Sequence, residues 1–172
     1  MPPAAIAVLL IVAVIVLGVI SVQRRLVMLD ENISNAMSQI GVQLSSQFDA
    51  LMTLLELTKG YAEYESEKLM ETMKARRSLI MAKSTPEDVQ CQEGIISEIL
   101  SRIVIVTEQY PELKANQKFT KGMGAMDTYE SMVRTSRLIY NDSVTKLNRE
   151  IRMFPVSLIA CILGFRQREY LE

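Results

Sequence analysis

The opening part of the chain contains its longest apolar run. Residues Ala4 to Val22 include no charged side chain, and Arg24 and Arg25 follow almost directly. A helix rises about 1.5 Å per residue, so the run is about 28 Å long and matches the hydrocarbon core of a bilayer. Lipid offers no partners to backbone N–H and C=O groups, so a spanning segment must be helical. The pattern predicts one membrane-spanning helix.

A cleaved signal peptide is the competing interpretation of this run. Signal peptides begin with basic residues, have a shorter apolar core and end at a small-residue cleavage site. This chain has no Lys or Arg before the run, and Gly18 to Ser21 stand where a cleavage site would lie. An uncleaved anchor is therefore favoured. The arginines after the run and their absence before it predict an outside N-terminus and a cytoplasmic body.

Apolar residues recur at helical spacing from residue 26 to about residue 83. One row has a spacing of eleven and consists of Leu29, Ile40, Leu51, Ala62 and Met73. This repeat corresponds to about 3.67 residues per turn, which is close to a straight helix. The stretch has no proline, so we predict one long helix, with Gly41 and Gly60 as places for a bend. Continuity with the span is left open.

A second helix is predicted from Pro86 to Tyr110. Thr85 suits the N-cap, Pro86 suits the first helical position, and two acids follow in the first turn. Residues 103–106 alone resemble a strand, but the surrounding helical period outweighs them. The predicted stripe consists of Val89, Gln92, Ile96, Ile99, Ile103, Val106 and Tyr110. Pro111 ends the helix because proline lacks the required N–H group.

A third helix is predicted from Gln117 to Met153, after a short connection capped by Asn116. One side of its seam is apolar and consists of Phe119, Met126, Val133, Tyr140, Leu147 and Phe154. A short helix over residues 156–165 follows. It is too short to cross a bilayer, so it either caps the bundle, which we favour, or lies at the membrane interface.

These elements predict an all-α fold: an N-terminal transmembrane helix, then an antiparallel bundle of three long helices plus a short C-terminal helix. Short links place successive helices side by side and antiparallel. Tyr110 and Pro111 are then expected back toward the membrane. The predicted domains are residues 1–25 with the span, residues 26–165 as the bundle, and residues 166–172 as a polar tail.

Composition narrows the chemistry. The formal net charge is −1 and the chain has no His, so neither a nucleic-acid partner nor a His-based metal or catalytic site is indicated. The two cysteines, Cys91 and Cys161, are too few for a disulfide framework or a metal cluster. We expect no cofactor.

Two groups of residues are candidate sites. Glu130 and Arg137 interrupt the seam of the third helix, and we expect a structural polar layer in which Gln39 and Gln43 of the first helix are partners. A buried acid–base cluster able to transfer protons is the alternative. The candidate interaction loop consists of Tyr110, Pro111, Glu112, Leu113, Lys114 and Asn116. A simple helix connector with a proline stop and an asparagine cap is the favoured explanation of this segment, and a partner-binding tip is the alternative.

Several segments follow one another along nearly the whole chain in a familiar order. They include Leu29-Asp30-Glu31, Lys59-Gly60-Tyr61-Ala62, Tyr110 to Asn116, Tyr140-Asn141-Asp142 with Asn148, and Phe154-Pro155. With these segments the chain resembles the LemA family of bacterial membrane proteins. The resemblance implies a single N-terminal span followed by a helical bundle, and little chemistry, because the family lacks an assigned activity. Thr53 stands where the family often has proline, which favours a straighter first helix.

The leading functional hypothesis is a non-enzymatic adaptor or scaffold held at the bacterial cell membrane. Its expected partners are the bilayer, through Ala4 to Val22, and either further copies of itself or another membrane protein. Two alternatives remain open. One is an enzyme that uses the Glu130 and Arg137 layer on a small substrate. The other is a membrane-shaping protein whose terminal helix enters the interface through Leu158 and Phe165.

Overall fold

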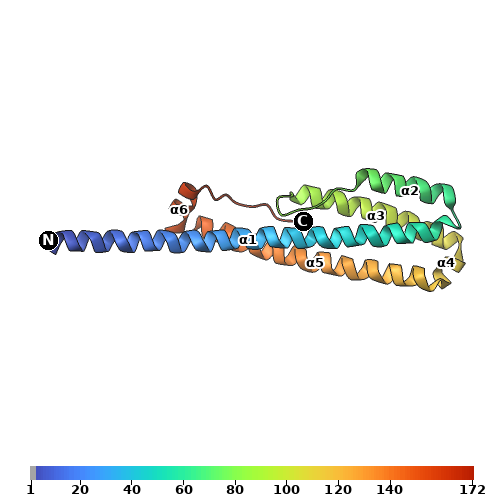
Figure 1. Cartoon of the computed structure of the whole chain (residues 1–172), viewed down its shortest axis with the longest axis horizontal. Coiled ribbons are helices and arrows are strands. Elements are labelled where there is room, and N and C mark those ends of the chain that lie inside the picture. Colours follow the sequence, from blue (N-terminus) through green and yellow to red (C-terminus); the bar gives the residue numbers. More distant parts are fainter. Residues whose placement is uncertain (1–2) are drawn as a thin grey trace. The chain divides into compact units, whose positions relative to one another are not determined.

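A computed structural model describes residues 3–172, and within this range it contains six helices and no strand (Figure 1). The helices are α1 Pro3–Lys59, α2 Glu63–Arg76, α3 Pro86–Gln109, α4 Pro111–Ala115, α5 Gln117–Arg152 and α6 Val156–Leu163. The predicted all-α fold is confirmed. Met1 and Pro2, the start of the predicted N-terminal segment, lie outside the described residues. The described residues form two compact units, one of residues 3–34 and 140–171 and one centred on residues 35–139.

Helix α1 resolves the question of continuity. It runs without a break past Arg25 and Gly41 to Lys59, so one helix of 57 residues carries both the apolar run and the first bundle stripe. The helix ends at Lys59, and in the turn that follows the N–H groups of Tyr61 and Ala62 both donate to the carbonyl of Thr58. The single helix predicted as far as residue 83 is therefore divided into α1 and α2.

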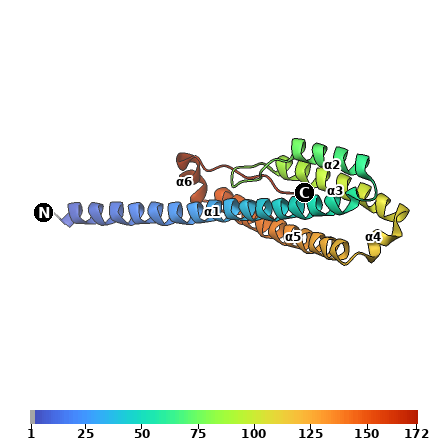
Figure 2. The ribbon, with the colours of Figure 1, turned by 45° about the vertical axis from the view of Figure 1, so that its right-hand side comes forward.

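The second unit contains one more reversal than the sequence analysis predicted. Helix α2 turns back after Gly60, and residues 77–85 continue the return as an irregular connection. Helix α3 then runs in the same direction as α1, and α5 returns (Figures 1 and 2). The ring centroids of Tyr61, after α1, and Tyr110, after α3, are 5.7 Å apart. The expectation that Tyr110 and Pro111 return toward the membrane is wrong, because α2 supplies the reversal that α3 was expected to make.

The core of this unit follows the predicted stripes. On α3 the residues from Val89 to Val106 in the stripe are all buried, and the capping box between Thr85 and Asp88 is formed by two reciprocal hydrogen bonds. Gln92, the polar member of the stripe, accepts from the N–H of Ser78 and donates to the carbonyl of Arg76. Its burial is compatible with the fold because both ends of the amide are paired.

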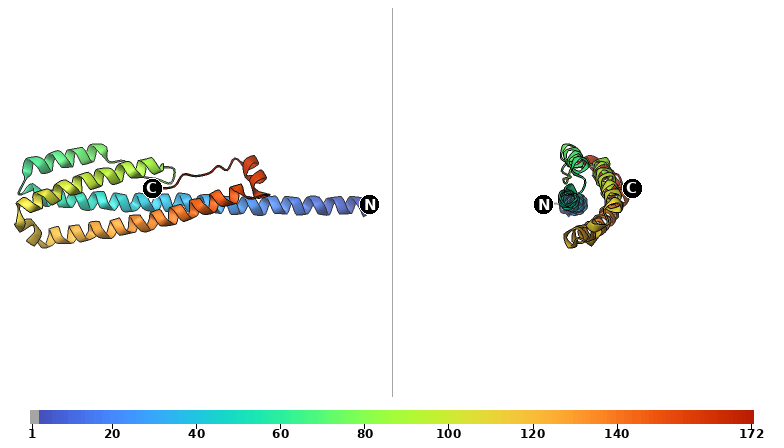
Figure 3. Two further views of the ribbon diagram at one scale, coloured as in Figure 1. Left: turned by 180° about the vertical axis from the view of Figure 1, so that it is seen from behind. Right: turned by 90° about the vertical axis from the view of Figure 1, so that its right-hand side faces the viewer.

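The first unit contains the N-terminal part of α1, the C-terminal part of α5, and α6 beside α1 (Figure 3). The apolar run at the start of α1 is long and apolar enough to cross a membrane, and its side chains are exposed in the described chain. Beyond it, Arg25 donates to Glu150 of α5 over 2.6 Å. The Glu150 side chain is 10% exposed, so this ion pair joins the two helices where the apolar run has ended.

The C-terminal tail docks onto α5 in the same unit. Asn148 donates to the carbonyl of Arg168 and accepts from its N–H, both over 2.9 Å. Asn141 makes the same pair of hydrogen bonds with Leu171, over 2.8 and 2.9 Å. The side chain of Leu171 is buried, and Arg168 also pairs with Asp30 of α1. The segment expected to be only a polar tail is therefore held in an extended form against the helices.

Candidate functional site

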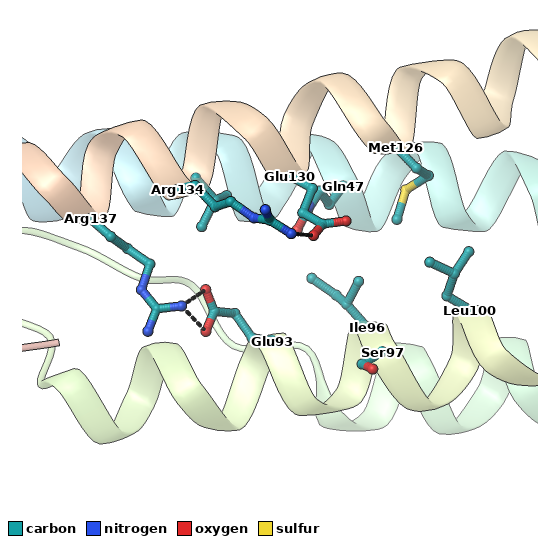
Figure 4. Close-up of a pocket in the computed structure, with 10 residues that line it drawn as sticks. Gln47, Glu93, Ile96, Ser97, Leu100, Met126, Glu130, Arg134 and Arg137 are labelled. Atoms are coloured by element: carbon teal, nitrogen blue, oxygen red, sulfur yellow. Dashed lines mark hydrogen bonds and ion pairs between the residues drawn. The ribbon is translucent and has the colours of Figure 1, made fainter. Parts of the chain in front are cut away.

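An open cavity of about 320 Å³ lies in the second unit, between α1, α3 and α5 (Figure 4). Its apolar wall comes from α3 and α5 and its polar groups come from all three helices. The lining residues are Gln47, Glu93, Ile96, Ser97, Leu100, Met126, Glu130, Val133, Arg134 and Arg137. The cavity therefore brings Glu130 and Arg137 of the predicted polar layer to one solvent-connected space.

Arg137 is paired with Glu93 of α3. One guanidinium nitrogen of Arg137 lies 3.3 Å from one carboxylate oxygen of Glu93 and 3.2 Å from the other. A single nitrogen shared by two oxygens is a weaker arrangement than two parallel N–H···O bonds. Both side chains are about one quarter exposed, so the pair stands at the wall of the cavity rather than inside the core.

Glu93 is the carboxyl group whose acidity the cavity alters. Burial raises the pKa of Glu93 above its ordinary value, because a carboxylate loses hydration when it is enclosed. The Arg137 charge lowers this pKa in part, and the nearby Glu130 charge raises it further. Glu93 is therefore a carboxyl group of the cavity that holds its proton more tightly than a solvated one does.

Glu130 is paired within its own helix. Its carboxylate accepts from Arg134, one turn further along α5, over 2.6 Å, and its side chain is 53% exposed. An exposed ion pair of this kind contributes little to stability. The expected partners on α1 also differ from those observed, since Gln39 is exposed and Gln43 is half-buried, and the α1 residue that lines the cavity is Gln47.

Gln47 is 5% exposed and lines the cavity from α1. Within the described chain, no fully buried side-chain nitrogen or oxygen lacks a partner. Gln47 therefore places a side-chain amide, which can both donate and accept hydrogen bonds, at the wall of the cavity. Figure 4 labels both Gln47 and Glu130 among the residues that line this space.

The sequence analysis did not identify Glu93 or Gln47. Glu93 follows Gln92, a member of the α3 stripe, and flanks the buried face of that helix. Such a flanking acid is a usual partner for a base on a neighbouring helix. The pattern alone gives no sign of which neighbour that is, because the parallel course of α1 and α3 depends on the turn at Gly60.

The candidate interaction loop is compactly built. Pro111–Ala115 form the short helix α4, Leu113 is fully buried, and the side chain of Asn116 accepts from the N–H of Lys118 to cap α5. Glu112 and Lys114 are exposed. These contacts are those of a connector between α3 and α5, with two opposite charges left on its outer face.

The chain is similar in sequence to one protein family and to individual relatives. The profile of the LemA family matches residues 36–172. Protein LemA of Metamycoplasma hominis is 26% identical over 137 residues, which cover 77% of this chain and 61% of that protein. The magnetosome proteins MamQ 1 and MamQ 2 of Paramagnetospirillum magneticum are each 30% identical over 80 residues, covering 46% of this chain and 29% of theirs. The chain thus spans less than two thirds of the length of each of these relatives.

Proposed function

Because the chain belongs to the LemA family, we propose that it is a membrane-anchored adaptor that self-associates or binds another membrane protein without catalysing a reaction. Family membership and the apolar start of α1 make it a membrane-associated protein. The adaptor role goes further and rests on one observation, the apolar side chains that the bundle exposes outside the span.

Two of these exposed side chains, Tyr64 and Ile105, line an open hollow of about 500 Å³ between α2 and α3. Tyr64, Leu69 and Ile105 line it, and Lys68 and Arg102 are among the charged residues around them. Tyr64 is 79% exposed and Ile105 is 54% exposed. An aromatic and aliphatic floor with a charged rim is the usual composition of a protein–protein interface. This hollow supports a docking role for the α2 and α3 face.

The proposed arrangement in the membrane follows from charge. Arg24 and Arg25 follow the span, and the residues before it carry no Lys or Arg. Short basic flanks stay in the cytoplasm, so the N-terminus faces outside and the bundle is cytoplasmic. Cys91, an exposed thiol on α3, tests this arrangement. An impermeant maleimide should label it in opened cells and leave it unlabelled in intact ones.

Site-specific crosslinking in intact membranes tests the adaptor role. A photoreactive amino acid at Ile105 should give a discrete adduct, either a dimer of the chain or a complex with one dominant protein. The matched control is Leu79, which is 63% exposed but lies outside the hollow and should give no such adduct. A chain that stays monomeric and unpartnered with the photoreactive group at Ile105 would refute the adaptor role.

A second candidate function is an enzyme or small-molecule binder that uses the cavity. The observation in its favour is the solvent-connected space that Glu130, Glu93 and Arg137 line together. A ligand with a carboxylate for Arg137 and an apolar part for the α3 wall fits this composition. An activity or ligand affinity that Glu130→Gln abolishes while the fold is retained would support it. Glu98→Gln is the control, because Glu98 pairs with Arg76 and Arg102 outside the cavity.

A further inference from the structure

Helix α6 exposes an apolar row. The row consists of Leu158 and Ile162, which are four residues apart within α6 and share one face, and of Phe154 in the turn before the helix; they are 60%, 84% and 80% exposed. Ala160, on the opposite face, is fully buried and marks the side on which α6 packs. The eight residues of α6 carry no charge. A contiguous apolar face of this kind marks an interaction site in soluble and peripheral proteins.

The position of α6 indicates what this face meets. Val156, at its start, lines a small cavity of about 90 Å³ together with Ser21, Val22 and Arg25 of α1. Val22 is the last residue of the apolar run, so α6 begins at the level where α1 leaves the hydrocarbon. Figures 1 and 3 both show α6 beside this part of α1.

The charges around α6 fit a lipid surface. Arg24, Arg152 and Arg166 are exposed, and none of them forms an ion pair within the described chain. Basic residues beside an apolar helix face are attracted to anionic headgroups, each with a modest contribution. The eight residues extend over only about 12 Å as a helix, so α6 can lie in the interface but cannot cross the bilayer.

From these observations we infer that α6 lies in the membrane interface beside the span, with Phe154, Leu158 and Ile162 inserted among the lipids and the neighbouring arginines at anionic headgroups. The inference rests on the proposed membrane anchoring. It replaces the bundle cap that the sequence favoured, because a cap would bury the row that the structure leaves exposed. A second copy of the chain seated on this row is the competing occupant.

The two native cysteines allow a direct test with the full chain in nanodiscs that contain anionic lipid. Cys161 lies on the exposed side of α6 and Cys91 lies on α3, and both are exposed. The Cys91→Ser variant therefore keeps one thiol, Cys161, as the label site on α6. The Cys161→Ser variant keeps Cys91 on α3 as the reference site. We expect an impermeant maleimide to react with Cys161 roughly tenfold more slowly than with Cys91, and spin-labelled lipid to quench a fluorophore on Cys161 alone.

A negative charge introduced into the apolar row should release α6 from the membrane interface. Ile162→Glu is expected to raise the reactivity of Cys161 to that of Cys91 and to remove the lipid quenching. Leu138→Glu, at a residue of α5 that is 72% exposed and lies outside both the cavity and the hollow, should change neither. Equal reactivity of the two thiols in the otherwise unchanged chain would overturn the inference. A second outcome would also overturn it: Cys161 is protected, the spin-labelled lipid does not quench its fluorophore, and the protection increases with the number of chains per disc. That outcome would identify a second copy of the chain as the occupant. A chain that fails to enter the discs at all contradicts the anchoring instead.

Discussion

Gly41 is the position where a single methyl group should have the largest effect. A Cβ added at Gly41 of α1 would lie 2.1 Å from the carbonyl oxygen of Ile80, in the connection between α2 and α3. This distance is far below the 3.4 Å at which such contacts become ordinary. The obstacle is backbone rather than a flexible side-chain end, so Gly41→Ala forces the connection away from α1.

The expected loss of stability depends on how the connection between α2 and α3 responds to the added methyl group, and the less costly response sets its size. If it stays, overpacking costs about 1–3 kcal/mol. If it detaches, the buried side chain of Ile80 is exposed, which costs about 2 kcal/mol. Against this cost, alanine within a helix stabilises the folded state by about 1 kcal/mol relative to glycine. We therefore expect Gly41→Ala to lower the free energy of unfolding by a net amount of about 0–1 kcal/mol, which lowers Tm by up to roughly 4 °C in a protein of this size.

Gly124 is the matched control. It lies within α5, and a Cβ built there meets nothing within 4 Å. Gly124→Ala should therefore gain the helix propensity alone, about 1 kcal/mol, and raise Tm. Thermal unfolding of both variants, followed by circular dichroism in one detergent, gives the comparison. A Gly41→Ala variant as stable as Gly124→Ala would refute the close approach of Ile80 to α1.

Three further outcomes are expected. The raised pKa of Glu93 means that the folded state binds its proton more tightly than the unfolded state does. The wild type should therefore lose stability relative to Glu93→Gln as the pH rises through that pKa, and denaturant unfolding of both proteins from about pH 4 to 8 measures the difference. Thr85→Ala removes the N-cap acceptor of α3 and should cost about 1 kcal/mol in the same thermal assay. Asn148→Ala removes both hydrogen bonds to Arg168 and should speed proteolytic loss of the tail, whereas Asn141→Ala should free mainly the terminal residues.

The helices with strong local signals were predicted well. The limits of α3 and α5 follow from Pro86, Pro111 and Asn116, because prolines and caps act through the backbone of their own segment. Six of the seven residues of the predicted α3 stripe are buried, because its heptad period requires no knowledge of the neighbouring helix. Tyr110 is only half-buried, and Ile95 and Thr107, outside the predicted stripe, are buried as well.

The direction of α3 and the composition of the cavity could not be predicted in the same way. Gly60 was identified as a place for a bend, but a glycine permits a full reversal as readily as a slight one. Helix α2 is mostly polar, so its stripe did not mark it as a separate element. Once α2 reverses the chain, α3 runs parallel to α1 and Glu93 meets Arg137. The pairing of the charged residues is thus a consequence of one turn.

The docked tail shows how a helix can hold an extended segment through spacing alone. Asn141 and Asn148 are seven residues apart on α5, which separates them by about 10.5 Å along the helix. Their partners, Arg168 and Leu171, are three residues apart, which is about 10 Å in an extended chain. The two distances match, so both side-chain amides can bond the backbone of the tail at the same time. Because each side-chain amide bonds backbone N–H and C=O groups, these contacts fix the register of the tail whatever its side chains are. Two side chains of the tail make contacts of their own: Arg168 forms an ion pair with Asp30, and Leu171 is buried.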